Sequence, residues 1–152
     1  MIIIGEKINT SLKAIRPAVE NQDAATIQDV AKRQVAAGAH YIDVNCGTFP
    51  FREPELLEWL VNTVQEVVSQ PLCIDSPNPE ALEVALKANK NGKPLINSIT
   101  AEKARFNSIL PLVVKYNTSI IALCMDDDGM PETADDRVRI AERLVEAMTK
   151  EG

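Results

Sequence analysis

Acidic and amide side chains recur at four places in the sequence where a short apolar run ends. They are Glu6 and Asn9, Asp43 and Asn45, Asp75 and Ser76, and Asn97 and Ser98. Asp43 and Asp75 stand inside their apolar runs, and a buried carboxylate needs hydrogen-bond donors. A carboxylate can accept two parallel N–H bonds, and an amide matches an edge that carries both donors and acceptors. These side chains therefore suit a neutral, nitrogen-rich heterocycle better than a phosphorylated sugar.

The other reactive side chains give weaker signals. Cys46, Cys73 and Cys124 form no CxxC pair and no zinc spacing, so we interpret them as reduced thiols that pack as small apolar groups. His40 is the single histidine and follows Gly38 at an expected helix-to-strand turn, where a structural role is predicted. The run at 126–129, DDDG, lacks the ligand spacing of an EF-hand and is interpreted as a solvated acidic loop. No metal site is predicted.

The elements that position these residues follow an alternating pattern. Short apolar runs, which predict strands, stand at 1–9, 41–45, 72–75, 95–97 and 119–125. The segments between and after them predict helices, from their helical spacing at 27–35, 56–68, 106–113 and from 133–136 onward, and from a helix-start signal at 78–80. The last helix is expected to bury Val138, Ala141, Leu144, Val145 and Met148. No glycine-rich phosphate loop follows the first run, which favours a barrel over an open doubly wound sheet. In a parallel barrel the polar strand ends converge on one rim, and a pterin fits such a rim.

Length and charge set further limits. The 152 residues are interpreted as one domain of about five strand–helix units, whereas a closed (β/α)8 barrel needs about 250 residues. We therefore expect a fragment, in preference to strands supplied by another copy or an open variant. The net charge of −6 argues against nucleic acid, and the apolar runs are too short to span a membrane. The first residues lack the features of a secretory signal, so a cytoplasmic location is expected.

Four segments carry a family resemblance. The sequences MIIIGEKIN at 1–9, YIDVN at 41–45, LCIDS at 72–76 and PLINS at 94–98 resemble the strands of methyltetrahydrofolate:corrinoid methyltransferases, which belong to the pterin-binding barrel group. The resemblance implies that Asp75 and Asn97 hold the pterin ring. It also implies that Glu6, Asn9, Asp43 and Ser76 line the pocket, and Asn45 completes the set of candidates.

The same resemblance implies methyl transfer between N5 of tetrahydrofolate and the cobalt of a corrinoid carried on a partner protein, with a homodimer as the expected assembly. In that family a further pterin-binding Asp and the Asn that assists N5 follow on later strands, so no catalytic residue is assigned. The 152-residue polypeptide is expected to bind folate weakly and not to turn over. A transferase of the dihydropteroate synthase type is disfavoured because Lys7 is the only basic residue in the opening segment. The other alternative is a non-catalytic partial barrel that serves in binding or assembly.

Overall fold

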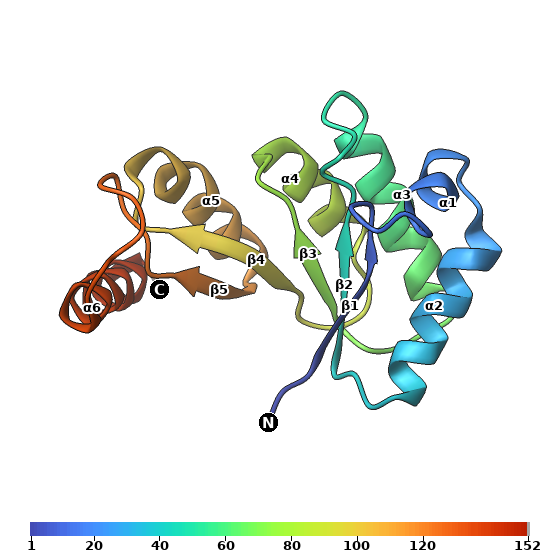
Figure 1. Ribbon diagram of the computed structural model, residues 1–152, viewed down its shortest axis with the longest axis horizontal. Helices are drawn as coiled ribbons and strands as arrows, with labels where there is room; N and C mark the ends of the chain where they lie inside the picture. The colour runs from blue at the N-terminus through green and yellow to red at the C-terminus, as the bar shows by residue number, and fades with distance from the viewer. Residues whose placement is uncertain (152) are drawn as a thin grey trace. The chain divides into compact units, whose positions relative to one another are not determined.

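Strands and helices alternate along the chain in a computed structural model, which describes residues 1–151 (Figure 1). The strands are β1 (Ile4–Asn9), β2 (Tyr41–Asn45), β3 (Leu72–Asp75), β4 (Leu95–Thr100) and β5 (Ser119–Leu123). The helices are α1 (Arg16–Glu20), α2 (Ala24–Ala36), α3 (Glu53–Gln65), α4 (Pro79–Ala88), α5 (Lys103–Tyr116) and α6 (Ala134–Glu151). The predicted α/β class with five strand–helix units is confirmed.

The chain forms two compact units, one from Met1 to Leu95 and one from Ile96 onward, and each is described by itself. Within the described residues no helix is long and apolar enough to cross a membrane. A single domain over 1–152 stays a prediction.

In the first unit β1, β2 and β3 are parallel neighbours, and α2, α3 and α4 pack against them. The side chains of a strand alternate between its two faces. On β2 and β3 the side chains directed toward the helices are fully buried and apolar: Ile42, Val44, Leu72 and Ile74. This layer is the core of the unit, and it leaves the polar residues of the same strands on the opposite face.

Local signals at the helix ends agree with the structure. The Asp23 carboxylate accepts a hydrogen bond from the Thr26 N–H at 3.2 Å at the start of α2, and Gly38 beyond its end has φ +94°, a conformation that favours glycine. Asn78 caps α4 by accepting from the Glu80 N–H at 3.0 Å. The short helix α1 was not predicted, and α3 ends at Gln65 instead of continuing to residue 68.

In the second unit β4 and β5 are neighbours, and α6 packs against β5. The prediction that α6 buries Val138 and Val145 is wrong, because these side chains are 55% and 60% exposed. The helix buries Leu144, as expected, and also Ile140, which was not among the expected residues. Each residue turns a helix by about 100°, which rotates Val145 away from Leu144. Of the remaining expected core residues, Ala141 and Met148 are half buried.

The prediction of a solvated acidic loop at 126–129 is wrong for its first residue. Asp126 is only 6% exposed, and its Oδ2 accepts a hydrogen bond from Arg143 Nη2 at 2.8 Å. Its Oδ1 accepts from the Asp128 N–H at 3.1 Å. A cation from the following helix compensates the buried carboxylate, which composition alone did not reveal.

Candidate functional site

The face of the first sheet opposite the helices is polar, and we call it the polar face: Asn9, Asp43, Asn45, Cys73 and Asp75. Strand register brings these residues together, because Asn9 lies beside Asn45 and Asp43 lies beside Cys73. Paired residues of parallel strands direct their side chains to the same face. Five of the predicted site residues belong to the first three strands, and the structure places Asn9, Asp43, Asn45 and Asp75 on this face.

The ends of β2 and β3 are joined by a hydrogen bond between Asn45 and Asp75. Asn45 Nδ2 donates to Asp75 Oδ2 at 2.7 Å, and Asn45 Oδ1 accepts from the Gly47 N–H at 3.0 Å. The amide is therefore held at both ends, and it fixes the orientation of the Asp75 carboxylate. Asp75 is half buried. A carboxylate offers about four acceptor positions, so Asp75 can accept from Asn45 and from a ligand together.

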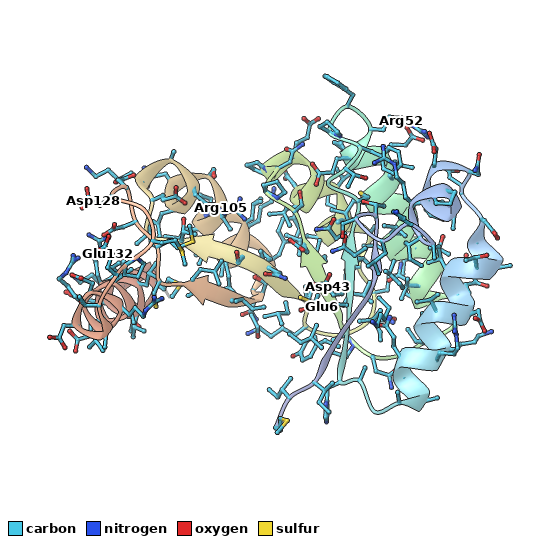
Figure 2. The ribbon with its side chains drawn as sticks, viewed as in Figure 1. Glu6, Asp43, Arg52, Arg105, Asp128 and Glu132 are labelled. Carbon is cyan, nitrogen blue, oxygen red and sulfur yellow. The ribbon has the colours of Figure 1, made fainter. Side chains whose placement is uncertain are left out.

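A thiol lies between carboxylates deeper on the polar face. Cys73 is fully buried, and burial, followed by the charge of Asp43 and a hydrogen bond to it, raises the pKa of Cys73 above its ordinary value, with smaller effects from Asp75 and Glu6. The thiol therefore stays protonated and serves as a donor to Asp43, which is 1% exposed. Glu6 is exposed, and Figure 2 labels it beside Asp43. The interpretation of all three cysteines as free thiols is confirmed.

Asn9 and Ser76 make hydrogen bonds that order the loops after their strands. Asn9 Oδ1 accepts from the N–H and the hydroxyl of Ser11 at 2.9 and 2.7 Å. Ser76 is fully buried; its hydroxyl donates to Glu53 Oε1 at 2.7 Å and accepts from the Asn78 N–H at 3.0 Å. The Ser76 hydroxyl thus contacts the start of α3, and its place in a ligand pocket stays a prediction.

Glu53 is a residue that the sequence analysis missed. It is the first residue of α3 and only 3% exposed. An acidic residue at a helix start is an ordinary sequence signal, and it says nothing about burial. The available clue was the following Pro54, which marks the helix start and so places Glu53 close to the strand ends.

Asn97 belongs to the second unit, where it lies on β4 and is half buried. The next residue, Ser98, is buried, and its carbonyl oxygen accepts from Arg105 Nη2 at 2.6 Å. That Asn97 acts together with Asp75 stays a prediction. Among the residues the structure describes, no group of three His, Cys, Asp or Glu side chains is arranged to hold a metal ion.

The electrostatic character of the polar face restricts what it can bind. Its ionisable side chains are acidic or neutral, and Glu6 adds a further carboxylate beside it. Such a surface repels phosphate and carboxylate groups and attracts N–H donors. It can orient a flat heterocycle through paired hydrogen bonds from Asp75, whose direction Asn45 sets.

Comparison with known proteins agrees with this chemistry. Residues 5–152 match the profile of the pterin binding enzyme family. The chain is 41% identical to the methylcorrinoid:tetrahydrofolate methyltransferase of Eubacterium limosum over 153 residues, which is 99% of this chain and 56% of that protein. It is 30% and 29% identical over 156 residues to the methionine synthases of Mycobacterium tuberculosis (strain ATCC 25618 / H37Rv) and Mycobacterium leprae (strain TN), with 98% of this chain and 13% of each synthase covered.

The chain thus spans about half the length of the first of these relatives and a small part of the synthases. The resemblance drawn from the four strand segments is confirmed, and the family profile matches nearly every residue. This chain belongs to the family of pterin-binding enzymes.

Proposed function

We propose that this chain is the folate-binding part of a methyltransferase that moves a methyl group between N5 of tetrahydrofolate and the cobalt of a corrinoid on a partner protein. The observation that carries the proposal is the Asn45–Asp75 pair, a carboxylate aimed by an amide at the ends of two parallel strands. It is supported by 41% identity to a protein named for methyl transfer between a methylcorrinoid and tetrahydrofolate. Tetrahydrofolate or its 5-methyl form is the substrate.

The pterin grip rests on hydrogen bonds to the ring edge. In the proposal Asp75 accepts two N–H bonds from the 2-amino-4-oxo pyrimidine edge, and Asn97 matches the neighbouring donor and acceptor. Because Asn45 already orients Asp75, less conformational entropy is lost when the ring binds. Asp43, Glu6 and Asn9 line the pocket, whereas Ser76 contributes through the backbone turn that its hydroxyl orders.

The contribution of this chain to the reaction is positioning. Methyl transfer is a displacement at carbon, and the amine leaves well when N5 carries a proton or a strong hydrogen bond. The corrinoid supplies the cobalt that exchanges the methyl group. The residues of the polar face hold the ring so that N5 faces the partner, and a fixed orientation of this kind lowers the barrier by removing rotational freedom.

The assembly and location belong to the same proposal. A corrinoid protein is the partner, a second copy of the chain forms a homodimer, and both act in the cytoplasm. Light scattering coupled to size-exclusion chromatography measures the mass of the chain and tests the dimer.

The experiment is a titration with 5-methyltetrahydrofolate by calorimetry, with the parent chain and the variants Asp75→Ala and Asn97→Ala. Loss of hydrogen bonds to a charged group costs about 1.5–3 kcal/mol, so Asp75→Ala is expected to weaken binding by about tenfold or more. Glu58→Ala is the control, because Glu58 is an exposed carboxylate of α3. If both site variants bind as tightly as the parent, the site assignment is wrong.

A second arm measures the reaction itself. Residues 1–152 replace the matching part of the Eubacterium relative, and methyl transfer to a corrinoid protein is followed in the chimera. The proposal expects transfer by the parent chimera and at least a tenfold loss with Asp75→Ala. A chimera that transfers methyl equally well with and without the Asp75 carboxylate contradicts it.

A further inference from the structure

A buried carboxylate lies at the start of α3, next to the ends of β2 and β3. Glu53, the first residue of α3, is 3% exposed. Its Oε1 accepts a hydrogen bond of 2.7 Å from the hydroxyl of Ser76, which is fully buried. Its main-chain oxygen accepts from the Cys46 thiol, with the sulfur at 3.6 Å. Burial, with a smaller effect from the Glu53 charge, raises the pKa of Cys46 to about 12.

The two partners of Glu53 each follow a residue of the pterin site. Cys46 comes directly after Asn45, and Ser76 comes directly after Asp75. Asn45 and Asp75 are bonded to each other on the polar face, while Cys46 and Ser76 are both bonded to Glu53 at the start of α3. The ends of β2 and β3 are therefore tied together both directly and through Glu53.

The loop geometry keeps Glu53 close to the amide that aims Asp75. A Cβ added to Gly47 would lie 3.6 Å from Asn45 Oδ1 and 3.8 Å from Glu53 Oε1. The Gly47 N–H is the group that holds Asn45 Oδ1. A shift of Glu53 would thus disturb the backbone that carries Asn45 as well as the backbone that carries Asp75.

The burial of Glu53 has physical compensation. Removing a carboxylate from water costs several kcal/mol unless donors replace the water. Here the Ser76 hydroxyl donates directly, and the carboxylate stands at the first residue of a 13-residue helix, whose N-terminus favours negative charge. These contacts compensate the cost of burying the carboxylate and connect Glu53 to the residues that follow β2 and β3.

We propose that Glu53 is a positioning residue for Asp75, which holds the ends of β2 and β3 in the geometry that aims the Asp75 carboxylate at the pterin ring. This inference rests on the proposed function for its ligand. Glu53 itself contacts no substrate in the proposal; it acts through Ser76 and Cys46.

The test compares Glu53→Ala and Glu53→Gln with two controls on the same helix, in the full chain. Glu58→Ala removes an exposed carboxylate, and Val64→Ala removes core volume at a fully buried site away from the strand ends. Three quantities are measured: the urea midpoint, the Kd for 5-methyltetrahydrofolate, and the side-chain amide resonances of Asn45 without ligand.

The expected result is a Kd that rises about tenfold in Glu53→Ala, in line with the cost of misplacing a positioned group. Glu53→Gln keeps an oxygen that can accept the Ser76 hydrogen bond, so its affinity for 5-methyltetrahydrofolate should fall less than that of Glu53→Ala. The Asn45 amide resonances should move in Glu53→Ala and stay in place in both controls. If Val64→Ala, at an equal urea midpoint, loses as much affinity as Glu53→Ala, the effect is one of general stability and the inference is overturned.

The same experiment separates failure of this inference from failure of the proposed function. If Asp75→Ala abolishes binding while Glu53→Ala binds as the parent does, the positioning role is wrong and the pterin site stands. If Asp75→Ala binds as the parent does, the assignment of the pterin site is wrong. The Asn45 amide resonances of ligand-free Glu53→Ala then test the positioning role by themselves. A shift supports that role, and unchanged resonances overturn it. If Glu53→Ala does not fold, the Kd and the Asn45 resonances are taken from Glu53→Gln.

Discussion

The Asn45–Asp75 hydrogen bond allows a sharp test through the substitution Asn45→Asp. The two side chains are nearly identical in shape, and the retained Oδ1 can still accept from the Gly47 N–H. The change replaces the Nδ2 donor, which lies 2.7 Å from Asp75 Oδ2, with an oxygen. A donor–acceptor contact becomes a contact between two carboxylates.

The size of the effect follows from the distance. Two carboxylates in contact have charge centres about 4 Å apart, which gives a repulsion of about 4 kcal/mol at the dielectric constant of about 20 that suits a half-buried site. The lost hydrogen bond to a charged acceptor adds about 1.5–3 kcal/mol. The sum is a large part of the 5–15 kcal/mol that stabilises an ordinary domain.

The repulsion makes the loss depend on pH. In the folded variant the pair can relieve it by binding a proton, so the pKa of the pair rises above the value of about 3.9 that an unfolded Asp has. The folded state then holds more protons than the unfolded state, and stability falls as the pH rises through this window. Relative to the parent, the destabilisation should be greatest near pH 8 and should shrink toward about pH 4, where the bound proton lets one carboxyl group donate a hydrogen bond to the other.

The assay is urea denaturation of parent, Asn45→Asp and Asn45→Ala at several pH values from 4 to 8. Asn45→Ala is the matched control, because it removes the same donor without adding a charge, and its loss should depend far less on pH than that of Asn45→Asp. A difference in free energy of unfolding between Asn45→Asp and the parent that stays constant over the whole range would refute the reasoning. It would mean that the two side chains do not face each other as the 2.7 Å contact requires.

Three further predictions concern the first unit and its thiols. Gly5→Ala should lower the free energy of unfolding by about 1–3 kcal/mol, since the new Cβ would lie 2.6 Å from the Oε1 of the buried Gln34; an unchanged urea midpoint contradicts this. Asn78→Ala should cost about 1 kcal/mol by removing the cap of α4, whereas Asn78→Asp should retain it, as measured by thermal unfolding. At pH 8, Cys46 should react with a thiol reagent far more slowly than the half-exposed Cys124 in mass-spectrometric labelling. Its pKa of about 12 leaves about a thousandfold less thiolate than an ordinary value of 9.0.

The strands and most helices were predictable because their signals are local. Largely apolar runs of four to six residues specify the strands, and a side chain such as Asn78 marks a helix start through a hydrogen bond to the first turn of its helix. The short α1, of five residues, gives too little periodicity to detect. The buried face of α6 was harder to predict, because apolar residues such as Val138 and Val145 show only which positions could pack against a neighbour. Which of them pack depends on neighbouring elements.

The polar residues of the site divide by a rule that was already present in the sequence. Side chains alternate along a strand, so Asp43 and Asn45 share one face. The Ser76 hydroxyl donates to Glu53 at the start of α3, and its place on the pterin rim stays a prediction. What alternation alone cannot supply is the partner, because Glu53 reaches Ser76 across 23 residues through the packing of α3. The proposed pterin site therefore has two layers, one that would face the ligand and one that would hold the first in place, and only the first can be predicted from residue types at strand ends.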